Sequence, residues 1–493
     1  MTDAAAPMPD LAGIPASIPA TDPLAPYDAV LLLSYGGPRR PEDVLPFMRN
    51  ATAGRGVPDS RLLEVSGHYQ GFGGASPINA RNAELRDALQ ARLAERGSTL
   101  PVVVGNRNWH PFVSQALREL ADTGARHVLA LPTAAFGSYS GCRQYREDLA
   151  GAAALLAAGA DGSTGDGFEA DAAARVGGEG GAPVDLTVDK TRPYYNTPGL
   201  LEANVDAIVE AYGTLAEQGV AAADVRLVLV THSIPLGMEA GSAPTPESDG
   251  ASESAGAGQP AGRPAGPREP GVAADLSTEV SYVAQHRALA AVLVPEVARR
   301  LGLEEVESDL VYCSRSGPPQ ARWLEPDVND HLEALAAGQL TDGSPADRPG
   351  GVVVAPFGFI SDHMEVVFDL DTEAAQTARD LGMPYARAAT VGTHPAFVDS
   401  LVDILIERAA VARGEDVHPA STTGVGPFHT VCPPSCCRPG THHPGRHSRH
   451  GADGAAHESA AGHQPAADGS CRPASAEPES LKPASCGRMK EKR

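Results

Sequence analysis

Six short runs of apolar residues set the pattern of this chain. They span residues 28–34, 101–105, 127–132, 226–231, 309–313 and 351–356. An uninterrupted apolar run is typical of a strand that is buried on both faces of a sheet. Between these runs, residues 78–95, 198–216, 280–301 and 365–381 have the apolar period of a helix. The alternation of strand and helix predicts an α/β protein.

The two halves of the chain share a short motif. His110-Pro111 precedes one predicted helix and His394-Pro395 precedes another, which is weak evidence for an internal duplication. In doubly wound sheets, ligands bind beyond the carboxyl ends of the strands. This rule directs attention to Tyr35, to His232 and to the residues after Pro356.

Four segments contain too few large apolar side chains to pack. They are residues 1–26, 151–182, 240–275 and 424–493, and in 151–182 alone 20 of 32 residues are Ala or Gly. Because such segments cannot offset chain entropy by burial, we expect disordered tails and surface insertions. The N-terminus has no signal-peptide pattern, and no run approaches the roughly 20 apolar residues of a membrane span. We therefore expect a cytoplasmic protein.

The charge balance argues against one class of partner. The 493 residues carry a formal net charge of −23 at pH 7. Binding of nucleic acid needs a concentrated basic face, which this composition does not supply. We expect no nucleic-acid partner.

The seven cysteines are distributed unevenly. Their number is odd and five lie in the last 62 residues, so a disulfide framework is not indicated. Cys432, Cys436 and Cys437 lie within six residues, and Cys142 brings the number of thiols to four. Four thiolates suit a 2Fe-2S cluster or a zinc ion, although adjacent Cys436 and Cys437 strain the usual zinc spacing. Cys313 lies in an apolar run and is expected to be a small buried side chain.

A histidine and a row of carboxylates follow two of the predicted strands. His232 lies at the end of the run 226–231, where a structural hydrogen bond and a catalytic role are both open. Glu365, Asp369 and Glu373 are spaced to share one face of a helix. Like charges in such a row destabilise a helix by a few tenths of a kcal/mol per pair, roughly. Either an exposed acidic helix start or a row that conducts cations or protons into a cleft would explain them.

Six sequence blocks together resemble the ferrochelatase family, most closely its actinobacterial branch. They are LLLSYGGP (31–38), HYQGFGGASPIN (68–79), LVTHSIP (229–235), SYVAQ (281–285), YCSRSGPPQARWLEPD (312–327) and PFGFISDHMEVVFDLD (356–371). The resemblance implies an α/β fold of two similar Rossmann-like, chelatase-type domains. Each is a four-stranded parallel sheet flanked by helices, with a porphyrin cleft between them.

The resemblance also suggests a domain layout. It places the two domains at 27–195 and 196–412, with a last helix at 394–411 expected to pack back on the first domain. A cluster-binding extension at 413–440 and a His-rich disordered tail at 441–493 would follow.

The family's reaction is insertion of Fe²⁺ into a porphyrin with release of two protons. A neutral imidazole can ligate Fe²⁺ and accept a proton, and a carboxylate can do either. The resemblance therefore implies that His232 and Glu365 are the metal-binding catalytic pair, and that Asp369 and Glu373 form the path for metal or protons. Tyr35 matches the family position on the opposite face of the ring, or it is a phenol that only caps its strand.

The carboxylates of a porphyrin need hydrogen-bond donors. Ser76, Tyr69 and Tyr145 match family positions that touch the macrocycle. Two family arginines are missing, because His68 stands beside Tyr69 and the second position leaves Arg55 as the nearest guanidinium. Arg55 is either a bidentate carboxylate donor or an ordinary surface arginine.

The actinobacterial branch carries a 2Fe-2S cluster on one distant cysteine and a C-terminal triple. This implies Cys142, Cys432, Cys436 and Cys437 as ligands. Cys471, Cys486 and the seven histidines of the final segment 424–493 receive no function. The expected substrate is coproporphyrin III, and the expected partner is a downstream coproheme-processing enzyme. The alternatives are a protoporphyrin IX ferrochelatase, a cobalt or nickel chelatase, and a non-catalytic tetrapyrrole or iron carrier.

Overall fold

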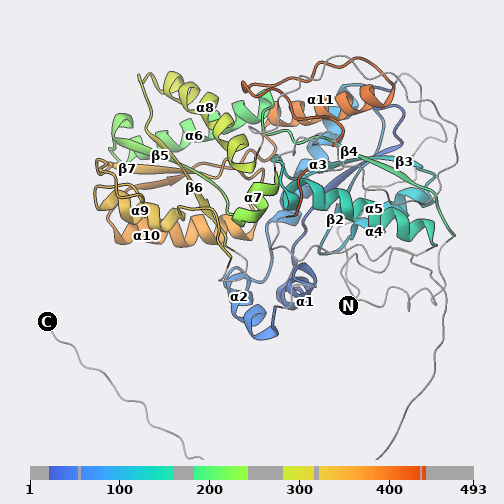
Figure 1. Cartoon of the computed structure of the whole chain (residues 1–493), viewed down its shortest axis with the longest axis horizontal. Coiled ribbons are helices and arrows are strands. Elements are labelled where there is room, and N and C mark those ends of the chain that lie inside the picture. Colours follow the sequence, from blue (N-terminus) through green and yellow to red (C-terminus); the bar gives the residue numbers. More distant parts are fainter. Residues whose placement is uncertain are drawn as a thin grey trace, which may run out of the picture. The chain divides into compact units, whose positions relative to one another are not determined.

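Two four-stranded parallel sheets, each with helices on its faces, form the centre of the structure (Figure 1). The computed structural model describes residues 22–53, 57–159, 182–242, 281–315, 321–432 and 436–439. Arg55, Cys471, Cys486 and the tail at 441–493 lie outside these residues, as do most of the two predicted insertions.

The first sheet has the order β2-β1-β3-β4. Its strands are β1 (Ala29–Ser34), β2 (Val102–Asn106), β3 (His127–Pro132) and β4 (Thr187–Lys190). β1 is central, with Val30 beside Val102 of β2 and Leu129 of β3. The helical elements of this half are η2 (Pro41–Asp43), α1 (Val44–Ala51), α2 (Asp59–Gly71), α3 (Ile78–Glu95), α4 (Val113–Asp122), η3 (Tyr139–Arg143) and α5 (Gln144–Ala157).

The second sheet repeats this order as β6-β5-β7-β8. Its strands are β5 (Val225–His232), β6 (Ser308–Cys313), β7 (Gly351–Ala355) and β8 (Tyr385–Arg387). Its helical elements are α6 (Pro198–Glu217), η4 (Ala222–Asp224), α7 (Leu236–Ser242), α8 (Tyr282–Leu301), α9 (Val328–Ala336), η5 (Val366–Ala374), α10 (Ala375–Asp380) and α11 (Pro395–Ala412). The common strand order agrees with the internal duplication suggested by the two His-Pro motifs, which lie directly before α4 and at the start of α11.

The predicted α/β class and all six apolar strands are confirmed. These strands are buried almost throughout, as expected for parallel sheets covered by helices on both faces. The two edge strands β4 and β8 escaped prediction because they have only four and three residues and carry charged side chains.

Helix α11 joins the two halves. It packs against α6 and also against α3 of the first half. Arg96, the residue that caps the C-terminus of α3, donates a hydrogen bond to Asp403 of α11 at 2.8 Å. The Arg192 guanidinium, which is 1% exposed, holds Glu407 of α11 through two hydrogen bonds of 2.7 and 3.0 Å.

Two predicted segment boundaries need correction. Helix α5 continues to Ala157 and buries Ala152 and Leu156, so it occupies the start of the range 151–182 that was assigned to an insertion. Residues 152–157 are all alanine or leucine, which are strong helix formers, so α5 continues through them. Leu24 is fully buried although it belongs to the predicted N-terminal tail 1–26.

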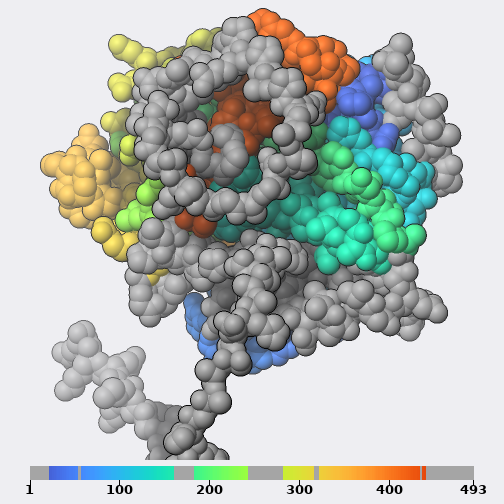
Figure 2. Space-filling view, turned by 45° about the vertical axis from the view of Figure 1, so that its right-hand side comes forward, coloured from blue at the N-terminus to red at the C-terminus, as the bar shows by residue number. Residues whose placement is uncertain are grey.

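The described C-terminal residues run back over the first half. Asn196 donates hydrogen bonds to Ser421 and to the carbonyl of Gly426. Figure 2 shows the red residues of this extension next to the teal residues of the first half. Within the described ranges, no helix combines the length and the apolar character that a bilayer crossing requires.

Candidate active site and thiol centre

The carboxyl ends of β5, β6 and β7 bring the candidate site together. His232 is the last residue of β5, Ser314 follows β6, and Gly358 lies just after β7. A Cβ atom on Gly358 would lie 2.1 Å from Thr231 Oγ1, so the chain after β7 approaches β5 more closely than any larger residue allows. This close approach carries Glu365 toward His232.

His232 and Glu365 face each other. His232 Nε2 lies 3.5 Å from Glu365 Oε2, and His363 Nδ1 lies 3.7 Å from the same oxygen. The other ring nitrogen of His232 is hydrogen-bonded to the carbonyl of Ser233. That bond fixes Nδ1 as the donor in the neutral ring and leaves the lone pair of Nε2 directed at the carboxylate.

The charges in this cluster are strongly coupled. Burial would raise the pKa of Glu365, but His232 and then His363 lower it to about 2. Burial would lower the pKa of His232, yet Glu365 raises it above its ordinary value. Burial lowers the pKa of His363 despite the same carboxylate. Glu365 is therefore ionised at neutral pH, and 41% of its side chain remains accessible to solvent.

The predicted acidic row exists, but its helix is not a regular α-helix. Residues Val366–Ala374 form a π-helix, in which the Ala375 N–H donates to the Leu370 carbonyl five residues back. π-helical turns are rare and often lie at functional sites. Glu365 and Glu373 still lie near Asp369 in this helix, since the negative charge of each raises the pKa of Asp369.

Asp369 is the central member of the row. Burial, followed by the charges of Glu365 and Glu373, raises its pKa to about 7 even though Ser314 donates a hydrogen bond to it. Ser314 has φ +63°, a left-handed conformation that is uncommon for a residue other than glycine. A carboxyl that titrates near neutral pH can both accept and release a proton under ordinary conditions.

An aromatic group from the first half faces this row. Tyr35, which is 39% exposed, and Tyr69 both pack edge-on against Phe47, with ring centroids 6.2 and 6.0 Å apart. Burial, then Glu365 and Tyr35, raise the pKa of Tyr69, which places this phenol near both groups. His68 stacks on Phe368 of the π-helix with ring centroids 3.9 Å apart.

A buried ion pair supports Tyr145. Arg107 pairs with Asp148, and both side chains are less than 10% exposed. The Arg107 guanidinium lies over the Tyr145 ring at 4.7 Å from the centroid and over the Tyr35 ring at 5.9 Å. Ser76 is also buried, and its hydroxyl accepts a hydrogen bond from the Ile78 N–H.

Three residues of this site were missed by sequence reasoning. Arg107 directly follows β2, so the strand-end rule that identified Tyr35 after β1 would also have found it. His363 stands two residues before Glu365 in the sequence block that carried the resemblance. Ser314 had no sequence signal, because its role depends on the backbone turn after β6. Arg55 is outside the described residues.

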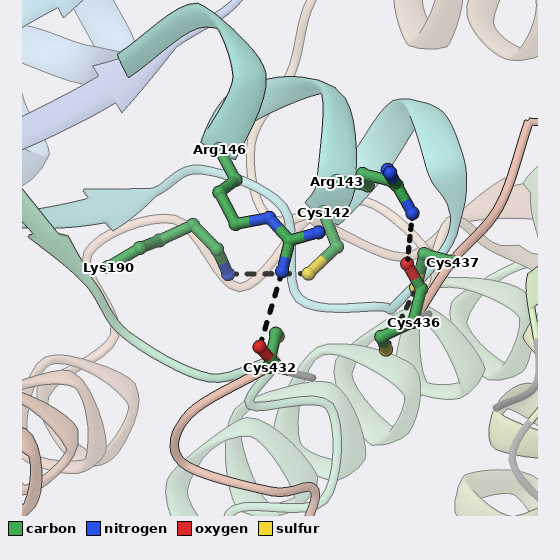
Figure 3. Close-up of a pocket in the computed structure, with 7 residues that line it drawn as sticks. All are labelled: Cys142, Arg143, Arg146, Lys190, Cys432, Cys436 and Cys437. Carbon is green, nitrogen blue, oxygen red and sulfur yellow. Dashed lines mark hydrogen bonds between the residues drawn. The ribbon is translucent and has the colours of Figure 1, made fainter. Parts of the chain in front are cut away.

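The predicted thiol ligands also come together (Figure 3). Cys142, Cys432, Cys436 and Cys437 line one small cavity with Arg143, Arg146 and Lys190. Cys142, Cys436 and Cys437 are buried, Cys432 is partly buried, and each of the four is a free thiol. Cys436 Sγ lies 3.7 Å from Cys437 Sγ.

Cationic groups surround these sulfur atoms. Lys190 Nζ lies 3.3 Å from Cys142 Sγ, and Arg143 and Arg146 donate hydrogen bonds of 3.3 Å to the carbonyls of Cys436 and Cys432. Hydrogen bonds from Cys432 and Cys437, together with the Lys190 charge, hold the pKa of the Cys142 thiol well below its usual range. Hydrogen bonds from Cys432 and Cys437 also lower the pKa of Cys436, whereas the pKa values of Cys432 and Cys437 are raised by these bonds. The centre therefore favours thiolates at Cys142 and Cys436, and thiolates are the ligands of iron-sulfur clusters and of zinc.

A histidine lies at the edge of the thiol centre. His429 Nε2 is 3.3 Å from Cys436 Sγ, and the ligand atoms of His429, Cys432 and Cys436 all lie within 4.8 Å of one another. Four thiols and their cations fit an anionic tetrathiolate group. His429, Cys432 and Cys436 together offer one nitrogen and two sulfur atoms, a second set of ligands that could hold a single metal ion.

Comparisons with known proteins assign this chain to a family. Residues 27–409 match the family model described as ferrochelatase. A coproporphyrin III ferrochelatase of Streptomyces coelicolor is 42% identical over 418 residues, which cover 84% of this chain and 94% of the relative. One from Streptomyces griseus is 43% identical over 413 residues, with the same shares covered. Among solved structures, SirB from Bacillus subtilis with Fe³⁺ aligns with a TM-score of 0.37 and 12% identity, covering 78% of this chain and 97% of SirB.

Proposed function

Because this chain belongs to the ferrochelatase family, we propose that it inserts Fe²⁺ into coproporphyrin III in heme biosynthesis, forming coproheme and releasing two protons. The observation that carries the substrate is the similarity to relatives named coproporphyrin III ferrochelatase along 94% of their length. The facing pair of His232 and Glu365 supports the chemistry, since it offers one nitrogen and one ionised oxygen to a metal ion.

In this proposal, His232 and Glu365 take Fe²⁺ from water and present it to the ring. Both donors lie on one side, so the metal approaches one face of the macrocycle. When Fe²⁺ is not bound to it, the Nε2 lone pair of neutral His232 can instead accept a pyrrole proton, since it serves either the metal or a proton at one time.

Asp369 and Glu373 carry the released protons away from the metal pair. A proton acceptor works best when its pKa is close to the ambient pH, and the pKa of Asp369 is raised to about 7. The hydrogen bond from Ser314 keeps the Asp369 carboxyl in the row.

Tyr35 approaches the opposite face of the ring, and the remaining polar groups receive the propionates. These groups are Ser76, Tyr69, Tyr145, His68 and Arg55. Coproporphyrin III carries four propionates, so it needs donors on more sides of the cleft than protoporphyrin IX, which carries two. In this scheme Arg107 does not bind a propionate itself, because its guanidinium is paired with Asp148. It positions Tyr145 by packing over the ring of that residue.

The thiol centre holds a 2Fe-2S cluster in this proposal, with Cys142, Cys432, Cys436 and Cys437 as ligands. The buried thiols and the three cations around them support an anionic cluster. When bound, such a cluster supplies a one-electron redox centre. A zinc ion on the same thiolates is the alternative.

Steady-state metallation under anaerobic conditions tests the proposed function. Purified protein is mixed with Fe²⁺ and either coproporphyrin III or protoporphyrin IX, and the loss of free-base porphyrin is followed. We expect kcat/KM to be at least tenfold higher for coproporphyrin III, about 1.4 kcal/mol of discrimination. Equal rates or a preference for protoporphyrin IX would identify the alternative ferrochelatase, and turnover limited to one equivalent would identify a carrier.

Two further parts of the proposal concern the cell. We place the enzyme in the cytoplasm, and we expect its product to pass to a coproheme-processing enzyme. Fractionation of cells for activity tests the first, and copurification of coproheme-consuming activity tests the second.

A further inference from the structure

Lysine is almost absent from this chain. Of the 39 basic residues only four are lysine, and three of these, at 482, 490 and 492, lie within the last twelve residues. Lys190 is therefore the only lysine among the first 481 residues, where every other permanent side-chain cation is arginine. Such a bias makes the one exception informative, because arginine and lysine differ in shape and in hydrogen bonding.

The exception lies at the thiol centre. Lys190 ends strand β4, and its Nζ atom donates hydrogen bonds to Cys142 Sγ at 3.3 Å and to the Thr191 carbonyl at 2.8 Å. Figure 3 shows the Lys190 side chain extended toward the Cys142 sulfur. The two arginines beside it are used differently, since Arg143 and Arg146 donate to backbone carbonyls of the cysteine segment.

The chemistry of the two cations explains this division. A guanidinium is a planar fork suited to oxygen pairs and carbonyls, whereas an ammonium is a compact charge that can be placed against a single atom. A hydrogen bond from a cation to a thiolate is stronger than one between neutral groups. Lys190 is thus suited to act on one ligand sulfur.

We infer that Lys190 raises the reduction potential of the cluster by its charged hydrogen bond to Cys142, an inference that rests on the proposed 2Fe-2S centre. One-electron reduction turns one Fe³⁺ of the cluster into Fe²⁺ and adds one negative charge to the cluster and its thiolates. A positive charge 3.3 Å from a ligand sulfur stabilises the reduced state more than the oxidised state. Lys190 is a positioning residue of this centre and not a catalytic residue.

The test is a dithionite titration of anaerobically purified full-length protein, followed by electron paramagnetic resonance of the reduced cluster. Lys190→Met removes the charge and the donor, and Lys190→Arg keeps the charge. Arg96→Met is the matched control, because it removes one cation whose described partner is Asp403. Iron and acid-labile sulfide are measured for each protein, so that the potential refers to the loaded fraction.

We expect Lys190→Met to shift the equilibrium constant for one-electron reduction at least tenfold toward the oxidised cluster, about 59 mV. Lys190→Arg keeps the charge but places a planar fork against a single sulfur atom, so its shift should be smaller than that of Lys190→Met, and Arg96→Met should not change the potential. If Lys190→Met alone fails to hold the cluster, Lys190→Gln, which removes the charge and keeps an N–H donor, replaces it in the titration, and a shift in the same direction is expected.

Three results would overturn the inference. The first is an equilibrium constant for reduction of Lys190→Met that lies within twofold of the parent value. The second is a shift of the same size in Arg96→Met. The third is cluster loss in both Lys190→Met and Lys190→Arg, which would indicate a structural role. A parent protein without a cluster would overturn this inference together with the cluster proposal, whereas turnover of coproporphyrin III is measured separately and reports on the proposed function.

Discussion

The Nε2 atom of His232, the last residue of β5, and the Oε2 atom of Glu365, in the segment after the adjacent strand β7, lie 3.5 Å apart. Each atom is set by local structure, because the Ser233 carbonyl orients the imidazole and the tight turn at Gly358 brings the second segment close. The two side chains offer one nitrogen and one oxygen to the same point. This arrangement suits a metal ion in transit better than a permanent site, since the described residues supply few ligands and leave the pair open.

Removal of either partner should therefore stop turnover. We expect His232→Ala and Glu365→Gln each to lower kcat by at least about 100-fold, the smaller end of the effect of a general acid-base group. Anaerobic initial rates with coproporphyrin III and Fe²⁺ measure this, and circular dichroism checks the fold. Retention of more than a tenth of the parent kcat in His232→Ala would contradict the assignment.

His394→Ala provides the matched control for loss of an imidazole. His394 is partly exposed and pairs with Asp206 at 3.2 Å, away from the strand ends that carry the site. Its removal should leave kcat within about twofold of the parent, as is usual for substitutions away from the functional groups.

The cysteines give an optical test. Protein purified without oxygen should be reddish-brown, and the visible absorption should be lost on changing Cys142, Cys432, Cys436 or Cys437 to Ser, because each is one of the four ligands in the proposed cluster. Cys313→Ala should keep the absorption, since Cys313 lies in β6 and not in the thiol centre. A colourless parent protein with stoichiometric zinc would replace the cluster by a zinc site.

The architecture was predictable because both sheets are parallel and covered by helices. Their inner strands contain short uninterrupted apolar runs, such as Leu227–Val230 within β5, which are typical of strands buried on both faces. The edge strand Thr187–Lys190 has no such signal, and Lys190 was overlooked with it. Residues in contact across the thiol centre also come from segments that no local pattern connects.

The candidate site was predictable only where one short block contains the residues. The row Glu365, Asp369 and Glu373 is visible from its spacing, but this spacing does not distinguish an α-helix from the π-helix that forms. Arg107 and Ser314 contribute through tertiary contacts, with Asp148 and with Asp369, which depend on how the loops after β2 and β6 fold.

Loss of the buried Arg107–Asp148 ion pair should destabilise the protein. Both side chains are buried, so Arg107→Met leaves an uncompensated carboxylate and should destabilise the protein by about 3–5 kcal/mol. Arg107→Met combined with Asp148→Asn should recover part of this loss. Thermal unfolding measures both, and an exposed pair supplies the control, because Arg300→Met should change the melting temperature little. A double variant as unstable as Arg107→Met would show that the ion pair is not the cause.

The raised pKa of Asp369 predicts a stability change with pH. The folded state holds the Asp369 proton up to about pH 7, whereas the unfolded chain loses it near its ordinary pKa of 3.8. Between these values the folded state binds more protons, so stability falls as the pH rises and then levels off above about pH 7. Asp369→Asn cannot ionise, and its stability relative to the parent should therefore increase between pH 5 and pH 8, by about 2–3 kcal/mol at roughly 1.4 kcal/mol per pKa unit.

The same group should shape the pH dependence of the reaction. If Asp369 accepts protons on their way out, kcat/KM should rise with pH through an apparent pKa near 7, and this limb should shift or disappear in Asp369→Asn. Glu365 cannot supply the limb, because its pKa is lowered to about 2 and it stays ionised. His232 can, since its pKa is raised from 6.5, so an unchanged limb in Asp369→Asn would assign the titration to His232. The loss of kcat at pH 8 should also be smaller for Asp369→Asn than for Glu365→Gln, because a relay group is easier to bypass than a metal ligand, and equal losses would exclude the relay.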